Sequence, residues 1–164
     1  CYLTTKISFS SMVGDLCVKV GAKPQNVLNA IGSDKRIGSH LLRYGYGYGG
    51  TCLPRDNRAL SVFAKKIGME CLISDATDQV NKKHTEFQIN EFCNQNLKDE
   101  SVILTNITFK PNSDIIEESQ KLEFAVGIAR RGYDVILEDK KIVLDEVKNI
   151  YGNLFKYKEL DNVT

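Results

Sequence analysis

In the first hundred residues, apolar side chains recur at a spacing of roughly 3.6 residues, the period of an α-helix. Between residues 3 and 20 this pattern is sustained, and Gly21 follows where such a helix would end. A second helical pattern starts at Pro24, a residue that fits a first helical turn. The pattern predicts helices over 1–20, 24–32, 57–67 and 74–97, the last of which Ser74 or Asp75 can cap. Residues 33–56 lack a regular pattern and are rich in Gly and Tyr.

Beyond residue 98 the pattern changes to short apolar runs that alternate with helical stretches. The predicted strands are 101–104, 133–137 and 154–157, and the predicted helices are 116–131 and a later one that ends at Gly152. Such alternation predicts a parallel sheet built from βαβ units. The sequence therefore predicts a mainly α-helical domain over 1–97, followed by an α/β domain with a parallel sheet over 98–164.

Both ends of this pattern are expected to be internal to a longer gene product. The first helix begins at Cys1 in mid-pattern, without an N-cap residue or an initiator Met. The predicted sheet stops after about three strands, fewer than is usual for a doubly wound sheet.

The composition favours a cytoplasmic protein that binds neither nucleic acid nor membrane. The net charge is +1, no apolar run approaches the length of a membrane span, and no signal peptide is visible. Five cysteines are widely spaced without a C-x-x-C pair, and there are two histidines, which argues against a zinc site or a disulfide framework. We therefore expect no metal, and reduced thiols that mostly pack in the core.

The segment from Tyr44 to Asp56 has the composition of a ligand-binding loop that leads into a reactive group. It reads YGYGYGGTCLPRD, in which four glycines expose backbone N–H groups and the tyrosines can stack on a base or a sugar. Cys52 lies near Arg55 and close to a predicted helix start, two features that favour a nucleophilic thiolate. Asp56 can accept a proton, and it can also cap the helix that follows.

Taken from composition alone, the same segment also fits a surface turn, and a single cysteine is more often a packing residue. It does not match the phosphate-binding P-loop. Residues 45–50 approach the dinucleotide fingerprint G-x-G-x-x-G but do not follow a predicted strand. At this level the alternatives stay open.

Five segments, in order and at matching spacing, resemble the UDP-glucose/GDP-mannose dehydrogenase family. Residues 47–56, GYGGTCLPRD, are similar to its signature G-[YF]-G-G-x-C-x-x-[KR]-D. The segments that begin at Lys6, Gly21 and Ile31 resemble its central helical domain, and 108–119 resembles its F-K-x-x-x-D-[DN]-x-R-x-S segment. The resemblance implies a central dimerisation domain followed by a partial, Rossmann-like UDP-binding domain.

The resemblance also implies an activity. Enzymes of this family oxidise the C6 alcohol of a nucleotide sugar, such as UDP-glucose, to a carboxylate in two hydride transfers to NAD. Cys52 matches the thiol that attacks the intermediate aldehyde and passes through a thiohemiacetal and a thioester. Asp56 matches the aspartate that helps to activate water, and Arg55 matches a cation near the cofactor. The implied partners are the nucleotide sugar and a second copy of the chain in a homodimer.

Further residues match family positions that contact the substrate. They are Arg36, from the neighbouring subunit; Arg43, beside the UDP phosphates; Tyr48, Gly49 and Gly50, in the sugar loop; and Phe109 and Lys110, at the uracil end. Ordinary structural roles are open for several of them: Phe109 as a core residue, and Arg43 and Lys110 as solvated charges. His84, on a helical stripe, is expected to be a packed or interface histidine rather than a ligand.

The chain also departs from the family pattern. The catalytic Lys and Asn and the Glu that promotes thioester hydrolysis would precede Cys1, so the chain alone is expected to be inactive. Glu117 stands in place of the usual Arg, and Asn106 where Gly is common. Three compatible interpretations result: a fragment of an NAD-dependent UDP-sugar 6-dehydrogenase, a dimerisation module, and a homologue that binds nucleotide sugar without oxidising it. Which nucleotide sugar is oxidised, and whether with NAD or NADP, stays open.

Overall fold

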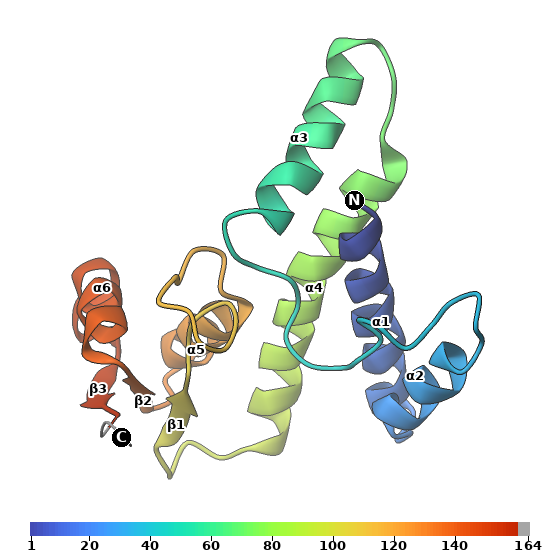
Figure 1. Ribbon diagram of the computed structural model, residues 1–164. Coiled ribbons are helices and arrows are strands. Elements are labelled where there is room, and N and C mark those ends of the chain that lie inside the picture. The colour runs from blue at the N-terminus through green and yellow to red at the C-terminus, as the bar shows by residue number, and fades with distance from the viewer. Residues whose placement is uncertain (161–164) are drawn as a thin grey trace. The chain divides into compact units, whose positions relative to one another are not determined.

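The computed structural model describes residues 1–160, which form helices in the first half and a small parallel sheet with helices in the second (Figure 1). The chain divides into two compact units, Cys1–Phe87 and Gln88–Thr164. This division falls inside a long helix, whereas the predicted boundary lies near residue 98. Residues 161–164 of the predicted second domain lie outside the described part. Within residues 1–160 no helix is long and apolar enough to cross a bilayer.

The helices of the first unit follow the predicted order with shifted starts. They are α1 (Tyr2–Lys19), α2 (Pro24–Gly32), α3 (Leu53–Lys66) and the first turns of α4 (Leu72–Gln95). Helix α3 begins four residues before the predicted start because Pro54 occupies its first turn, so Cys52 is the N-cap residue. Helix α4 begins two residues early, which places Ser74 and Asp75 inside the helix rather than at its cap.

The surface that α1 turns toward the rest of its unit is small and polar. Its buried residues are Thr4, Ser8, Ser10, Ser11, Gly14 and Cys17. Several of the apolar residues that predicted the helix face outward instead, including Leu3, Phe9, Met12, Leu16 and Val20. The periodicity therefore identified the helix correctly, but the apolar stripe is not the surface that packs inside this unit.

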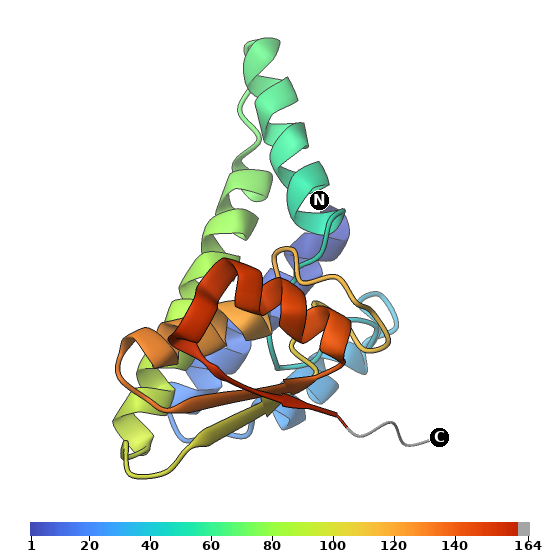
Figure 2. The same ribbon diagram turned by 90° about the vertical axis from the view of Figure 1, so that its left-hand side faces the viewer.

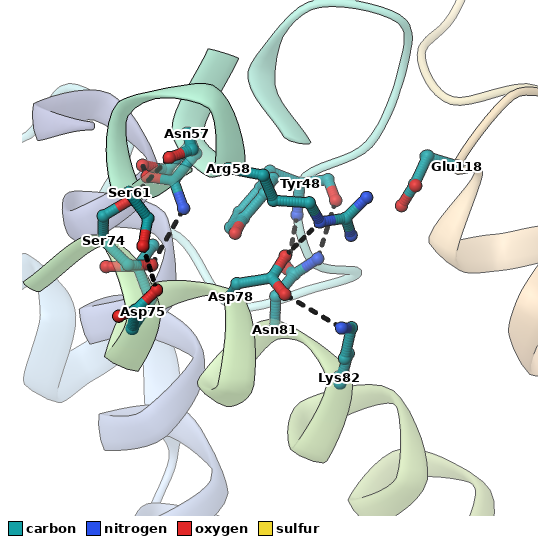
Figure 3. Close-up of polar contacts among 12 residues, drawn as sticks. Tyr48, Asn57, Arg58, Ser61, Ser74, Asp75, Asp78, Asn81, Lys82 and Glu118 are labelled. Atoms are coloured by element: carbon teal, nitrogen blue, oxygen red, sulfur yellow. Dashed lines mark hydrogen bonds and ion pairs between the residues drawn. The ribbon is translucent and has the colours of Figure 1, made fainter. Parts of the chain in front are cut away.

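Hydrogen bonds between buried side chains join the helices of the first unit. The Thr4 hydroxyl donates to Asn57 Oδ1 at 3.0 Å, and Asn57 Nδ2 donates to the Ser74 carbonyl at 2.9 Å. The Ser74 hydroxyl in turn donates to the Asn57 carbonyl at 2.5 Å. Figure 3 shows this exchange beside the bond from the Ser61 hydroxyl to Asp75. One buried asparagine of α3 thus links α1 to α4.

The second unit is a parallel sheet with helices packed on it. Its elements after α4 are β1 (Val102–Thr105), α5 (Gln120–Arg130), β2 (Val135–Asp139), α6 (Lys141–Tyr151), the short η1 (Gly152–Leu154) and β3 (Lys156–Glu159). The strand order is β1-β2-β3, with both pairs parallel, and Figure 2 shows α5 and α6 on one side of the sheet. The predicted mainly helical domain followed by a partial α/β domain with a parallel sheet is confirmed.

The core of the second unit is apolar, in contrast to the first. Val135, Leu137 and Val143 are almost completely buried, and they belong to one cluster contributed by the sheet, α5 and α6. The end of α4 joins this cluster, because the Phe92 ring packs edge-on against Tyr133, with 5.3 Å between the ring centroids. Helix α5 starts later than predicted because the Ser119 side chain caps it by accepting the N–H of Leu122.

Replacing Asn57 by Ala should destabilise the first unit. The change removes the bonds of Asn57 to the Thr4 hydroxyl and to the Ser74 carbonyl at a position that is 1% exposed. Loss of such buried hydrogen bonds should lower the free energy of unfolding by about 2–3 kcal/mol. Urea unfolding followed by circular dichroism measures the change. Asn90→Ala, on the exposed face of α4, is the control and should stay within about 0.5 kcal/mol of the parent chain. Equal effects at both positions would contradict the role assigned to Asn57.

Candidate active site

The glycine- and tyrosine-rich loop that precedes α3 is attached to α4 through Asn81. The Tyr48 N–H donates to Asn81 Oδ1, and Asn81 Nδ2 donates to the Tyr48 carbonyl, both at 2.9 Å. Figure 3 shows the Asn81 amide facing the Tyr48 backbone in this way. Both residues are 3% exposed. The buried Asn81 amide therefore satisfies both backbone groups of Tyr48, as a neighbouring strand would do in a sheet.

A second attachment lies at the start of the same loop. His84, one turn after Asn81 on α4, places Nδ1 2.9 Å from the Asp15 carboxylate of α1 and Nε2 2.7 Å from the Gly45 carbonyl. The Tyr44 hydroxyl donates to Asp15 Oδ1 at 2.7 Å. The Tyr44 ring lies directly on Gly14, where a Cβ would come within 1.9 Å of it, so only glycine fits there. The loop is thus fixed at Tyr44, Gly45 and Tyr48.

Cys52 lies where this loop enters α3. Gly50 turns the chain with a φ of +83°, a left-handed conformation that glycine adopts without strain. Cys52 then forms the N-cap of the 14-residue helix α3, and its carbonyl accepts the N–H of Asp56 at 2.8 Å. Its side chain is exposed, with the Thr51 hydroxyl 3.5 Å from Sγ. The thiol therefore stands at the helix N-terminus, where backbone N–H groups of the first turn have no partner within the helix.

Arg55 and Asp56 project from the first turn of α3. Their side chains are 69% and 64% exposed, and Arg55 Nε lies 2.9 Å from Asp56 Oδ1. The expectation that Asp56 caps the helix is wrong, because the helix starts at Leu53 and places Asp56 inside the first turn. Cation, carboxylate and thiol all occur within five residues, at the same end of one helix.

The remaining predicted residues of the first unit differ in exposure. Arg36 is exposed and donates to both oxygens of Asp34, a pairing that lowers the pKa of the Asp34 carboxyl. Arg43 is exposed as well, while Gly49 is half-buried and Gly50 is buried. Tyr48 is buried in the unit, which favours a role in holding the loop over stacking on a ligand. Tyr46, 41% exposed, is the loop tyrosine that presents most surface.

Phe109 and Lys110 belong to the second unit, in the segment after β1. The Lys110 ammonium lies over the Phe109 ring, 5.3 Å from its centroid. Phe109 is half-buried and Lys110 exposed. Asn106, before them, has a φ of +52°, the conformation that makes glycine common at such a position. Asparagine is among the residues that tolerate it best.

The residues that fix the loop were not identified from the sequence as a group. Asp15, Tyr44 and Asn81 carry no motif, and His84 was expected only to pack. That expectation is confirmed by its burial, but both ring nitrogens also have polar neighbours. The expectation that most cysteines are core residues is wrong, since only Cys17 is buried, while Cys1 and Cys52 are exposed. Within residues 1–160, no three His, Cys, Asp or Glu side chains form a metal-binding group.

The first unit presents a thiol at the end of a glycine loop, and a parallel α/β unit follows it. Residues 1–83 match the central domain of the UDP-glucose/GDP-mannose dehydrogenase family. The chain belongs to this family.

Several known proteins are similar along most of the chain. UDP-glucose 6-dehydrogenase YwqF of Bacillus subtilis is 31% identical over 165 residues, covering 96% of this chain and 36% of the relative. UDP-glucose 6-dehydrogenase of Pseudomonas aeruginosa is 34% identical over 141 residues, covering 84% of this chain and 31% of the relative. The solved UDP-glucose dehydrogenase of Pyrobaculum islandicum superposes with a TM-score of 0.84 at 33% identity, covering 97% of this chain and 37% of that one. The chain thus spans about a third of the length of these relatives.

Cys52 should be the fastest of the five thiols to react with an alkylating reagent near neutral pH. It is exposed at the N-terminus of α3, whereas Cys17 is buried and Cys71 and Cys93 are half-buried. Limited alkylation followed by peptide mass spectrometry ranks the five sites, with Cys52→Ser as the control that identifies the fast signal. Cys1 is exposed as well, and its rate is compared with that of Cys52 in the same digest. Faster labelling of Cys17, Cys71 or Cys93 in the folded chain would remove the physical basis for Cys52 as nucleophile.

Proposed function

We propose that this chain is the nucleophile-bearing part of an NAD-dependent UDP-sugar 6-dehydrogenase that converts a nucleotide sugar to its uronic acid. The observation that carries the proposal is the exposed Cys52 thiol at the N-cap of α3, behind a loop that is fixed at Tyr44, Gly45 and Tyr48. Membership of the dehydrogenase family supports it. The free state of all five thiols fits a reducing compartment such as the cytoplasm.

The chemistry assigned to Cys52 is addition to an aldehyde. The thiolate forms a carbon–sulfur bond to the C6 aldehyde of the sugar, and the carbonyl oxygen takes a proton to give a thiohemiacetal. Loss of a hydride from C6 leaves a thioester, and attack by water returns the thiol and releases the carboxylate. Asp56, one turn along α3 from Cys52, is assigned to accept the proton of that water. Its Oδ1 lies 2.9 Å from Arg55 Nε.

NAD supplies the hydride acceptor for both oxidation steps. The residues of this chain fit a contact with the cofactor but not its main binding site. Arg55 is exposed beside Cys52 and offers a guanidinium to an anionic or polar group. The glycines at 45–50 follow no strand, since the described part of the first unit contains helices only.

The substrate assigned to the site is UDP-glucose or a related nucleotide sugar. Gly49 and Gly50 carry no side chain, and the half-buried Gly49 is assigned to contact the sugar through its backbone. The exposed guanidinium of Arg43 is assigned to a phosphate, and that of Arg36 to the substrate of a neighbouring subunit. Within the second unit, Phe109 and the Lys110 ammonium over its ring are assigned separately to nucleotide binding. The names of the relatives above favour UDP-glucose.

Turnover tests this function directly. A protein that joins this chain to the further domains of its family should form NADH with UDP-glucose, while the 164-residue chain alone should form none. Cys52→Ser should abolish steady turnover, and Asp56→Asn should lower kcat by about 10²- to 10⁴-fold, the usual contribution of a general base. Cys71→Ser, which changes a half-buried thiol outside the site, is the control. UDP-N-acetylmannosamine, GDP-mannose and NADP complete the panel, and full activity of Cys52→Ser would refute the mechanism.

A second function, self-association, is favoured by the outward face of α1. Phe9, Met12, Leu16 and Val20 lie three or four residues apart, so they form one stripe, and their exposed fractions range from 40% to 79%. Helix α3 and the start of α4 add exposed residues that include Phe63 at 59%. Apolar surface of this extent is typical of an interface. We assign it to a second copy of the chain in a two-fold dimer.

The chain should therefore scatter light as a dimer, with twice its 18.4 kDa mass, at high micromolar concentration. Leu16→Lys places a charge in the middle of the α1 stripe and should shift the equilibrium to the monomer, because a buried lysine has no partner there. Ile142→Lys, at a position 64% exposed on α6, is the matched control and should leave the dimer intact. A monomer mass for the parent chain would contradict the dimer.

A further inference from the structure

The imidazole of His84 has an oxygen acceptor at each ring nitrogen. Nδ1 lies 2.9 Å from both oxygens of the Asp15 carboxylate, and Nε2 lies 2.7 Å from the Gly45 carbonyl. A carboxylate and a carbonyl can only accept. The His84 side chain is completely buried, so water does not compete for either nitrogen.

These two contacts define the protonation state in which the ring fits. A neutral imidazole carries one N–H, so one of its nitrogens would direct a lone pair at an oxygen at hydrogen-bond distance. A protonated ring donates from both nitrogens, and the Asp15 carboxylate compensates its charge in the buried site. The geometry therefore corresponds to a histidinium–aspartate pair that holds the Gly45 carbonyl with its second N–H.

We propose that His84 is a positioning residue whose protonated ring fixes the start of the loop that carries Cys52. With Asn81 one turn away, it attaches Gly45 and Tyr48 to the same face of α4. The link from loop position to catalysis rests on the function proposed above, whereas the attachment itself does not.

Replacing the ring by a side chain that cannot donate to both oxygens should release the start of the loop, because the Gly45 carbonyl then loses the His84 donor. The titratable groups that contact the ring are Asp15 from α1 and Tyr44 from the loop, whose ring meets it edge-on at 5.5 Å. One turn further along α1, Lys19 lies over the Phe87 ring.

Nitrogen NMR of the imidazoles tests the protonation state without any enzyme assay. The chain has two histidines, so the signal that disappears in His40→Gln belongs to His40 and the other to His84. His40 is exposed, so this substitution should leave the fold unchanged. In the folded chain both His84 nitrogens should carry protons, because each faces an oxygen that can only accept. A His84 ring with one unprotonated nitrogen would overturn the proposal.

Amide hydrogen exchange tests the attachment. In His84→Gln, residues 45–48 should exchange about tenfold faster than in the parent chain, as expected from the loss of one hydrogen bond to a charged group. Asn81→Ala should also loosen the loop, because it removes both bonds to the Tyr48 backbone. His40→Gln, at an exposed position, should leave the protection unchanged. Parent-like protection of residues 45–48 in His84→Gln would refute the role.

Alkylation of Cys52 in the same samples connects the loop to the site. If His84 positions the loop, the Cys52 rate in His84→Gln should differ from that of the parent chain, whereas the rate in His40→Gln should not. Faster exchange of the loop without a change at Cys52 would retain the attachment and refute its link to the proposed catalysis. An unchanged loop together with a fast Cys52 would refute the attachment and leave the proposed function standing.

Discussion

The first unit depends on buried hydrogen bonds between its helices rather than on an apolar core. Thr4, Asn57 and Ser74 connect three helices, and His84 and Asn81 connect the loop to the longest of them. Such bonds are directional, and an unpaired buried polar group is costly, so few alternative arrangements satisfy them. The position of Cys52 follows from this network, because the loop before it and the helix after it are both attached to it.

The polar packing between the helices also explains why many apolar residues of the first unit are exposed. A helix has two sides, and α1 places its small polar side against α3 and the loop. Its phenylalanine, methionine and leucine side chains then face away from the unit. The small side chains allow close approach of the backbones, as the contact of Tyr44 with Gly14 illustrates. The second unit follows the opposite arrangement, with valine, leucine and isoleucine between its sheet and helices.

The sequence predicted the order and type of the elements well, because periodicity depends on local spacing. It predicted the βαβ unit correctly for the same reason, since buried parallel strands are short apolar runs. Helix starts were less accurate: α3 begins at Leu53, because Pro54 fits a first turn, and α5 begins only after Ser119 provides a cap. The contact between Asp15 and His84 could not be predicted, because the two residues are 69 positions apart in the chain and no local pattern connects them.

The glycine loop shows why composition alone gave an incomplete picture of the site. Glycines allow the backbone to turn at Gly50, yet they also make a loop costly to order, because a flexible chain loses more entropy when it is fixed. The tyrosines between them offset that cost. Tyr44 bonds to Asp15 and packs on Gly14, and Tyr48 is buried with both of its backbone groups bonded to Asn81. Tyr46 is the one that remains largely at the surface. The glycines thus allow the chain to turn, and the tyrosines attach it to the helices. Cys52 then follows as the N-cap of α3.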